Sequence, residues 1–135
     1  MKKVVCKFLL IIIWLLVIFI FSNQNGIKST GLTNNFLNTY LSFVDSDVVF
    51  ILIRKIAHVT EYFILGILVI SLLYDFNINK KATISILICI IFATMDEFHQ
   101  LFVDGRTGRF VDVIIDSIGF GVGILIYSKI KKKKP

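Results

Sequence analysis

Four long apolar runs alternate with polar segments along this chain of 135 residues. The runs cover about residues 4–21, 48–74, 82–102 and 110–128. Each is close to the roughly 20 residues that an α-helix needs to cross a hydrocarbon layer. The runs are apolar all round, whereas a helix of a soluble domain carries an apolar stripe. The pattern therefore predicts an all-α membrane protein, a bundle of four transmembrane helices in a single domain.

Composition agrees with this prediction. Hydrophobic residues make up 56% of the chain, and the mean hydropathy of +0.85 exceeds that of ordinary soluble domains. The first run is longer than the ~7–15-residue core of a signal peptide, and no small-residue cleavage site follows it. We therefore expect it to be an uncleaved membrane span.

The polar segments predict the connections between spans. Residues 22–49 read as a loop with one short amphipathic helix near residues 33–43, lying in the membrane interface. Residues 75–81 and 104–109 read as turns, the second with the sequence DGRTGR. In the last span, Gly119 and Gly123 are four residues apart and suit close contact with another helix.

The net charge is +6, and the placement of the positive charges predicts the orientation of the chain in the membrane. With the N-terminus inside, ten cations fall on the inner side and five on the outer side, and membrane proteins carry their excess of Lys and Arg on the inner side. The inner ones are Lys2, Lys3, Lys7, Lys80, Lys81, Lys129 and residues 131–134. We therefore expect a multi-pass protein of the cell membrane with both termini cytoplasmic. The basic residues match no nucleic-acid-binding module, so nucleic acid is not an expected partner.

In this orientation, the charged ends of the second, third and fourth spans all lie at the outer level. An ionisable side chain at mid-membrane costs roughly 2.5–3.5 kcal/mol, so such residues usually face a protein interior or a cavity. The candidate acid–base residues are His58, Glu61, Asp96, Glu97, His99, Asp112 and Asp116. The candidate ligand-binding residues are Arg54, Gln100, Arg106 and Arg109.

Within each helix, the candidates fall into pairs that share a face: His58 with Glu61, Asp96 with His99, and Asp112 with Asp116. Carboxylate–imidazole pairs serve acid–base chemistry, and arginines bind phosphate or carboxylate groups. Two alternatives stay open. The charges could simply neutralise one another and fix helix packing, or the acids and histidines could form a loose metal site. We assign no metal and no cofactor.

Three further side chains have a simpler interpretation. Lys55 and Arg109 could merely extend to the membrane interface, and Tyr62 could merely anchor its helix there.

Three motifs, in this order, resemble the VanZ-like family, small membrane proteins named for a teicoplanin-resistance accessory protein. They are FSNQ at residues 21–24, RKIAHVTEYFILG at residues 54–66 and DEFHQLFVDGRTGRFVDVIIDSIG at residues 96–119. One departure is Val103–Asp104, where the family more often has Val-Pro. The resemblance implies a bacterial protein with several spans, and some members lower susceptibility to teicoplanin and related lipid-bearing glycopeptides. By motif match, the implied functional residues are Arg54, His58, Glu61, Asp96, Glu97, His99, Gln100, Arg106, Asp112 and Asp116.

These inferences predict a cell-envelope protein whose outward-facing polar site engages a lipid-linked or cell-wall-associated group and contributes to glycopeptide tolerance. The expected partners are membrane lipids, with a lipid-linked cell-wall precursor or the glycopeptide itself as candidates. Two alternatives remain: a membrane enzyme that acts on a lipid head group by acid–base chemistry, and a non-catalytic interaction protein whose polar residues only hold the helices together.

Overall fold

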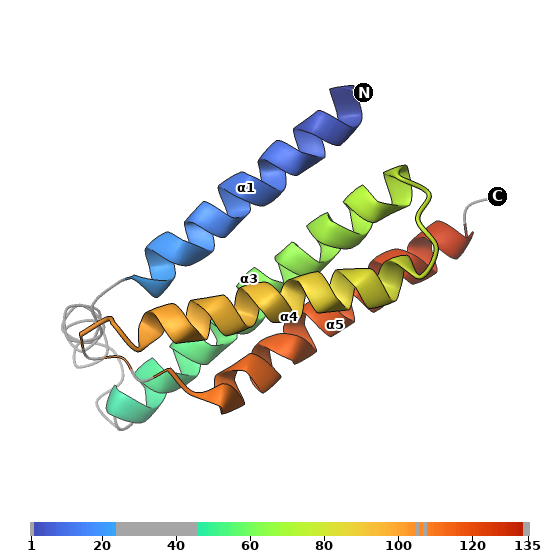
Figure 1. The fold of residues 1–135 in the computed structure, drawn as a ribbon. Helices are drawn as coiled ribbons and strands as arrows, with labels where there is room; N and C mark the ends of the chain where they lie inside the picture. The colour runs from blue at the N-terminus through green and yellow to red at the C-terminus, as the bar shows by residue number, and fades with distance from the viewer. Residues whose placement is uncertain (1, 24–45, 105, 107, 134–135) are drawn as a thin grey trace.

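The computed structural model describes residues 2–23, 46–104, 106 and 108–133, which are drawn in colour in Figure 1. These ranges contain four α-helices: α1 (Lys2–Ser22), α3 (Ser46–Asp75), α4 (Lys81–Gln100) and α5 (Phe110–Lys133). Each contains a segment long and apolar enough to cross a membrane, and the described ranges contain no strand. Within these ranges, the predicted all-α architecture and the four helices long and apolar enough to span a membrane are confirmed.

The helix ends differ slightly from the predicted ones. α4 ends at Gln100, two residues early, because the next backbone N–H groups bond three residues back, as in a tightened last turn. α5 continues past residue 128 into the lysine-rich segment, where cations interact favourably with a helix C-terminus. The amphipathic helix expected near residues 33–43 lies outside the described residues.

A tight turn connects α3 to α4 where the sequence predicts one. Asn77 and Lys80 adopt left-handed backbone conformations, with φ of 50° and 57°. Asparagine tolerates this conformation better than most residues do. The turn reverses the chain, so α3 and α4 run antiparallel (Figure 1).

Helix α3 is the centre of the bundle and contacts α1, α4 and α5, most extensively α5. α1 packs mainly on α3, touches α4 little and is the least buried of the four (Figure 1). We call the end where α1 and α4 finish and α3 and α5 begin the site end. The opposite end, which holds the turn between α3 and α4, is the turn end.

Three glycines, which we call the glycine seam, bring α3 and α5 together. A Cβ atom on Gly119 or Gly123 would collide with the carbonyl oxygen of Val59 or Phe63 respectively, and one on Gly66 would lie 2.6 Å from a carbonyl oxygen of α5. Only glycine allows the backbones to approach this closely. The predicted close contact of Gly119 and Gly123 is therefore confirmed.

Away from the site end, the described interior is apolar apart from a few hydrogen-bonded groups near the turn end. Lys7 Nζ of α1 lies 2.6 Å from Asp75 Oδ2 and donates a hydrogen bond of 3.0 Å to the Ser71 carbonyl of α3. Tyr127 of α5 donates a 3.0 Å hydrogen bond to Ser71 Oγ. Lys7, the single interruption of the first apolar run, therefore ties α1 to α3.

Candidate functional site

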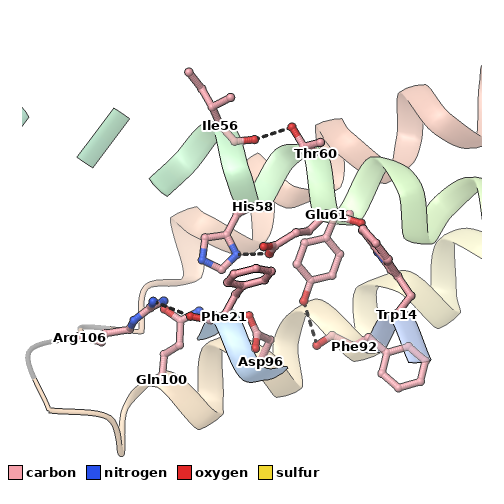
Figure 2. Close-up of polar contacts among 11 residues, drawn as sticks. Trp14, Phe21, Ile56, His58, Thr60, Glu61, Phe92, Asp96, Gln100 and Arg106 are labelled. Carbon is pink, nitrogen blue, oxygen red and sulfur yellow. Dashed lines mark hydrogen bonds and ion pairs between the residues drawn. The ribbon is translucent and has the colours of Figure 1, made fainter. Parts of the chain in front are cut away.

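All eleven predicted site residues lie at or near the site end, on α3, α4, α5 and the turn between α4 and α5. With Lys55, they form what we call the polar cluster. Figure 2 shows the part contributed by α3, α4 and the α4–α5 turn. The structure thus places the charged stretches of three separate helices together, as the alternation of spans predicts.

On α3, the predicted His58–Glu61 pair is in place. His58 Nδ1 and Glu61 Oε2 are 3.5 Å apart, just beyond usual hydrogen-bond length, and the side chains are 14% and 12% exposed (Figure 2). Arg54 lies on the same stripe and is half-buried. A carboxyl beside an imidazole, both largely shielded from the surroundings, can orient the ring and share a proton with it.

Glu61 is also tied to α1 through its main chain. Trp14 Nε1 donates a 2.9 Å hydrogen bond to the Glu61 carbonyl oxygen (Figure 2). No sequence pattern predicts this contact, because a tryptophan in an apolar span is indistinguishable from the other hydrophobic residues of that span.

Helix α4 contributes three buried polar side chains from its last turns: Asp96, Glu97 and Gln100. Gln100 Nε2 donates a 3.1 Å hydrogen bond to Asp96 Oδ2, so these two side chains hold each other. Glu97 Oε2 accepts a 2.9 Å hydrogen bond from the backbone N–H of Arg109, at the start of α5. A carboxylate at a helix N-terminus satisfies a donor that the helix leaves unpaired.

Glu97 therefore has a structural role that its spacing did not reveal. The α4–α5 turn also approaches α4 through Gly108, where a Cβ atom would collide with the Glu97 carbonyl oxygen. The Arg109 side chain is exposed, so its contribution to the cluster is its main chain.

Helix α5 contributes two aspartates with different environments. Asp112 Oδ1 pairs with Lys55 Nζ at 2.9 Å, and the two side chains are 19% and 39% exposed. The interpretation of Lys55 as a side chain that merely extends to the interface is therefore wrong. Asp116 is 1% exposed, and its Oδ2 finds no hydrogen-bond partner among the described residues.

Arg106 connects the α4–α5 turn to α1. Its Nη2 donates a 2.9 Å hydrogen bond to the Phe21 carbonyl oxygen, in the last turn of α1 (Figure 2). Burial lowers the pKa of Arg106 and Arg54 lowers it further, whereas Asp96 and two glutamates raise it. The guanidinium thus lies within electrostatic range of carboxyls from α3 and α4.

His99 faces α1. Its ring packs on Phe19, with 4.7 Å between centroids. Its Nε2 is buried and has no hydrogen-bond partner in the part of the chain that the structure describes. His99 and Asp96, predicted as a pair, both line an apolar cavity between α1, α3 and α4.

A second, much smaller hollow of about 10 Å³ lies inside the cluster. Its lining includes Arg54, His58, Glu97, Asp112 and Asp116. This volume is close to the minimum that one water molecule requires, and the lining supplies enough polar partners for it. The inner cluster is thus tightly packed rather than open.

Two further expectations change with the structure in hand. Tyr62 is 1% exposed and its hydroxyl lies 3.4 Å from the Phe92 carbonyl oxygen, so it is a core residue and not an interface anchor. Within residues 2–23, 46–104, 106 and 108–133, no three His, Cys, Asp or Glu side chains are grouped so as to hold a metal ion. The arrangement therefore gives the metal alternative no support.

A sequence model of the VanZ/LLP1 family matches residues 7–131, which include most of α1 and α5, all of α3 and α4, and every residue of the polar cluster. The chain belongs to the VanZ/LLP1 family. The resemblance carried by the three motifs is thereby confirmed. No curated protein and no solved structure matches the chain. Membership in the VanZ/LLP1 family and four apolar helices together identify a multi-pass membrane protein.

Proposed function

We propose that this protein acts in the bacterial cell envelope, where its polar cluster engages the polar group of a lipid-linked or cell-wall-associated molecule. Through this interaction it contributes to tolerance of teicoplanin and related lipid-bearing glycopeptides. The cluster faces the outer side of the cell membrane, and both termini are cytoplasmic.

One observation carries the proposal: the cluster holds buried polar atoms that nothing in the described chain satisfies. They include Asp116 Oδ2 and His99 Nε2. Leaving such an atom unpaired costs about 1–3 kcal/mol, so native proteins rarely do it without a reason. A purely structural cluster would be expected to satisfy its own members, whereas a binding site keeps donors and acceptors for its ligand.

The first test compares teicoplanin tolerance with the amount of folded protein. Glu61→Ala and Asp116→Ala each remove a polar-cluster carboxyl and should abolish the added tolerance, while membrane accumulation stays close to wild type. The neighbours Thr60 and Ser117 provide controls, because each hydroxyl only bonds a carbonyl of its own helix. Thr60→Ala and Ser117→Ala should keep full tolerance.

The same experiment can contradict the proposal. If Glu61→Ala and Asp116→Ala are degraded or misassembled, the charges hold the helices together and the third interpretation, an interaction protein, is favoured. If both accumulate and retain full tolerance, these carboxyls do not contribute to the function.

A second candidate is a membrane enzyme that acts on a lipid head group, and the His58–Glu61 geometry favours it. With the carboxyl 3.5 Å from the ring, His58 is positioned as a general acid or base. Activity should then vary with pH as this imidazole gains and loses its proton. His58→Gln keeps hydrogen-bonding capacity but cannot transfer that proton, so it should abolish turnover while ligand still binds. Full tolerance in a His58→Gln strain would rule out proton transfer by this residue.

Cysteine labelling tests the proposed orientation. Asp104 and Asn79 are exposed and lie in the turns at opposite ends of the bundle. In a protein with Cys6 and Cys89 replaced by serine, a membrane-impermeant thiol reagent added outside the cell should modify Asp104→Cys and leave Asn79→Cys unmodified. The reverse pattern would contradict the orientation and would place the cluster at the cytoplasmic face.

A further inference from the structure

An apolar cavity lies outside the tightly packed part of the polar cluster. It measures about 480 Å³ and is lined by residues of α1, α3 and α4. Its lining includes Leu15 and Leu16 of α1 and Phe92 and Met95 of α4, with Asp96 and His99 near the site end. It is therefore apolar along most of its length and polar at one end.

The cavity is open to the outside of the bundle along the side where α1 and α4 barely touch. Two of its lining residues, Leu16 and Met95, are 55% and 61% exposed. Both belong to segments that can cross a membrane, so the opening lies at the level of the hydrocarbon layer. Apolar cavities do not hold water. On the membrane side, the hydrocarbon chains of the lipids surround this opening.

The polar end limits what can occupy the cavity. His99 Nε2 has no hydrogen-bond partner within the described residues, and Asp96 lies one turn before it on α4. A purely apolar occupant would leave the histidine nitrogen unsatisfied. The lining therefore matches an amphiphile, with a chain along the leucines and a hydrogen-bonding group at Asp96 and His99.

The volume of the cavity fits a single hydrocarbon chain better than a transmembrane helix. It falls within the roughly 300–1,000 Å³ of small-molecule sites. A transmembrane helix is about 10–12 Å across and roughly 30 Å long, so its volume exceeds that of the cavity several-fold.

We infer that the cavity between α1, α3 and α4 binds one hydrocarbon chain of a membrane lipid, with the lipid's polar group at Asp96 and His99. This inference deepens the proposed function and rests on it for the role of the polar group. The lipid's hydrocarbon chain then enters from the side, between α1 and α4, and the lipid's polar group reaches the cluster. The cluster therefore meets its ligand from within the membrane.

The test is photo-crosslinking of the purified full-length protein in phosphatidylglycerol liposomes that contain a small fraction of the same lipid with a mid-chain diazirine. Labelled residues are located by mass spectrometry. Phe92 should be labelled several-fold more than Leu125, a 62% exposed leucine of α5 outside the cavity lining. Its labelling should saturate and should fall when unlabelled lipid is added.

Two matched substitutions on α1 test the entry route. Leu16→Trp places a large side chain at the opening and should lower Phe92 labelling several-fold. Leu9→Trp should leave it unchanged, since Leu9 is 52% exposed and does not line the cavity. If Leu16→Trp fails to accumulate, Met95→Trp obstructs the same opening from α4. Unsaturable labelling that is equal at Phe92 and Leu125, or unchanged labelling in a folded blocking variant, would overturn the inference.

The inference and the proposed function can fail separately. If labelling saturates and is blocked by Leu16→Trp, while Glu61→Ala and Asp116→Ala both accumulate and keep full teicoplanin tolerance, the lipid-chain site stands and the proposed function of the polar cluster fails. If Glu61→Ala loses tolerance while labelling is unsaturable, the proposed function stands and the chain site is wrong.

Discussion

The two halves of the α3–α5 helix pair use opposite kinds of residues. From Val59 toward the turn end, the helices meet through the glycine seam and apolar side chains, and backbone atoms lie nearly in contact. Toward the site end, the same two helices carry Arg54, Lys55 and His58 opposite Asp112 and Asp116, around a hollow of about 10 Å³. Close packing dominates one half and charge dominates the other.

This difference indicates which residues maintain the fold. Helices in a membrane associate through close packing rather than through the hydrophobic effect, and the glycine seam supplies that packing. Charged residues at a contact between two helices add desolvation costs that their mutual attraction only partly offsets. We therefore expect the bundle to assemble without the polar cluster, and this expectation supports the function that we propose for the cluster.

The largest expected effect on stability is at the seam. Gly123→Ala would place a methyl group against the Phe63 carbonyl oxygen and force α3 and α5 apart. Overpacking of this kind costs about 1–3 kcal/mol. Thermal unfolding in detergent, followed by the fluorescence of Trp14, should show a clear loss of stability. Trp14 is the single tryptophan of the chain, which makes the signal specific.

The control for this change is on the same helix. A Cβ atom on Gly121 would meet nothing within 4 Å, so Gly121→Ala should be neutral or stabilising, by up to about 1 kcal/mol from helix propensity. Equal effects of the two substitutions would show that the seam does not hold α3 and α5 together.

A smaller effect is expected where α1 joins α3. Lys7→Met removes the cation that pairs with Asp75, whose side chain is only 28% exposed. We expect a loss of about 1 kcal/mol, at the upper end of the range for partly exposed pairs. Lys3→Met, at an exposed position of the same helix, is the control and should have no effect. If Lys7→Met also has no effect, the ion pair with Asp75 does not help to hold α1 on α3.

The smallest effect is expected within the polar cluster itself. Lys55 pairs with Asp112, but its side chain is 39% exposed, and such pairs contribute about 0.2–1 kcal/mol. A double-mutant cycle with Lys55→Ala and Asp112→Ala measures the coupling directly. A coupling energy as large as the effect of Gly123→Ala would mean that the cluster stabilises the bundle as much as the seam does.

Much of this architecture follows from the sequence, because its strongest signals are length and hydropathy. Four apolar runs of membrane-spanning length predict four helices, and the alternation of spans brings Glu61, Asp96 and Asp116 to the same end. The spacing of Gly119 and Gly123 predicts their close contact. None of these inferences requires knowing how each helix is rotated about its axis.

The contacts that the sequence did not predict depend on that rotation. Helix α1 is apolar all round, so no stripe indicates that Lys7 faces Asp75, or that Trp14 faces Glu61. The hydrogen bond from Arg106 to Phe21 joins positions 85 residues apart and depends on how the α4–α5 turn meets the end of α1. The cavity beside Leu16 likewise results from how loosely α1 meets α4, which no local pattern encodes.

The most direct test of the central claim is whether the polar cluster binds envelope lipids. Purified protein, washed extensively in detergent, should retain a defined envelope lipid that native mass spectrometry detects. The double variant His58→Ala, His99→Ala should lose it while remaining monodisperse and folded. Equal retention by the wild type and the folded double variant would contradict the claim that the histidines of the polar cluster engage a lipid-linked group.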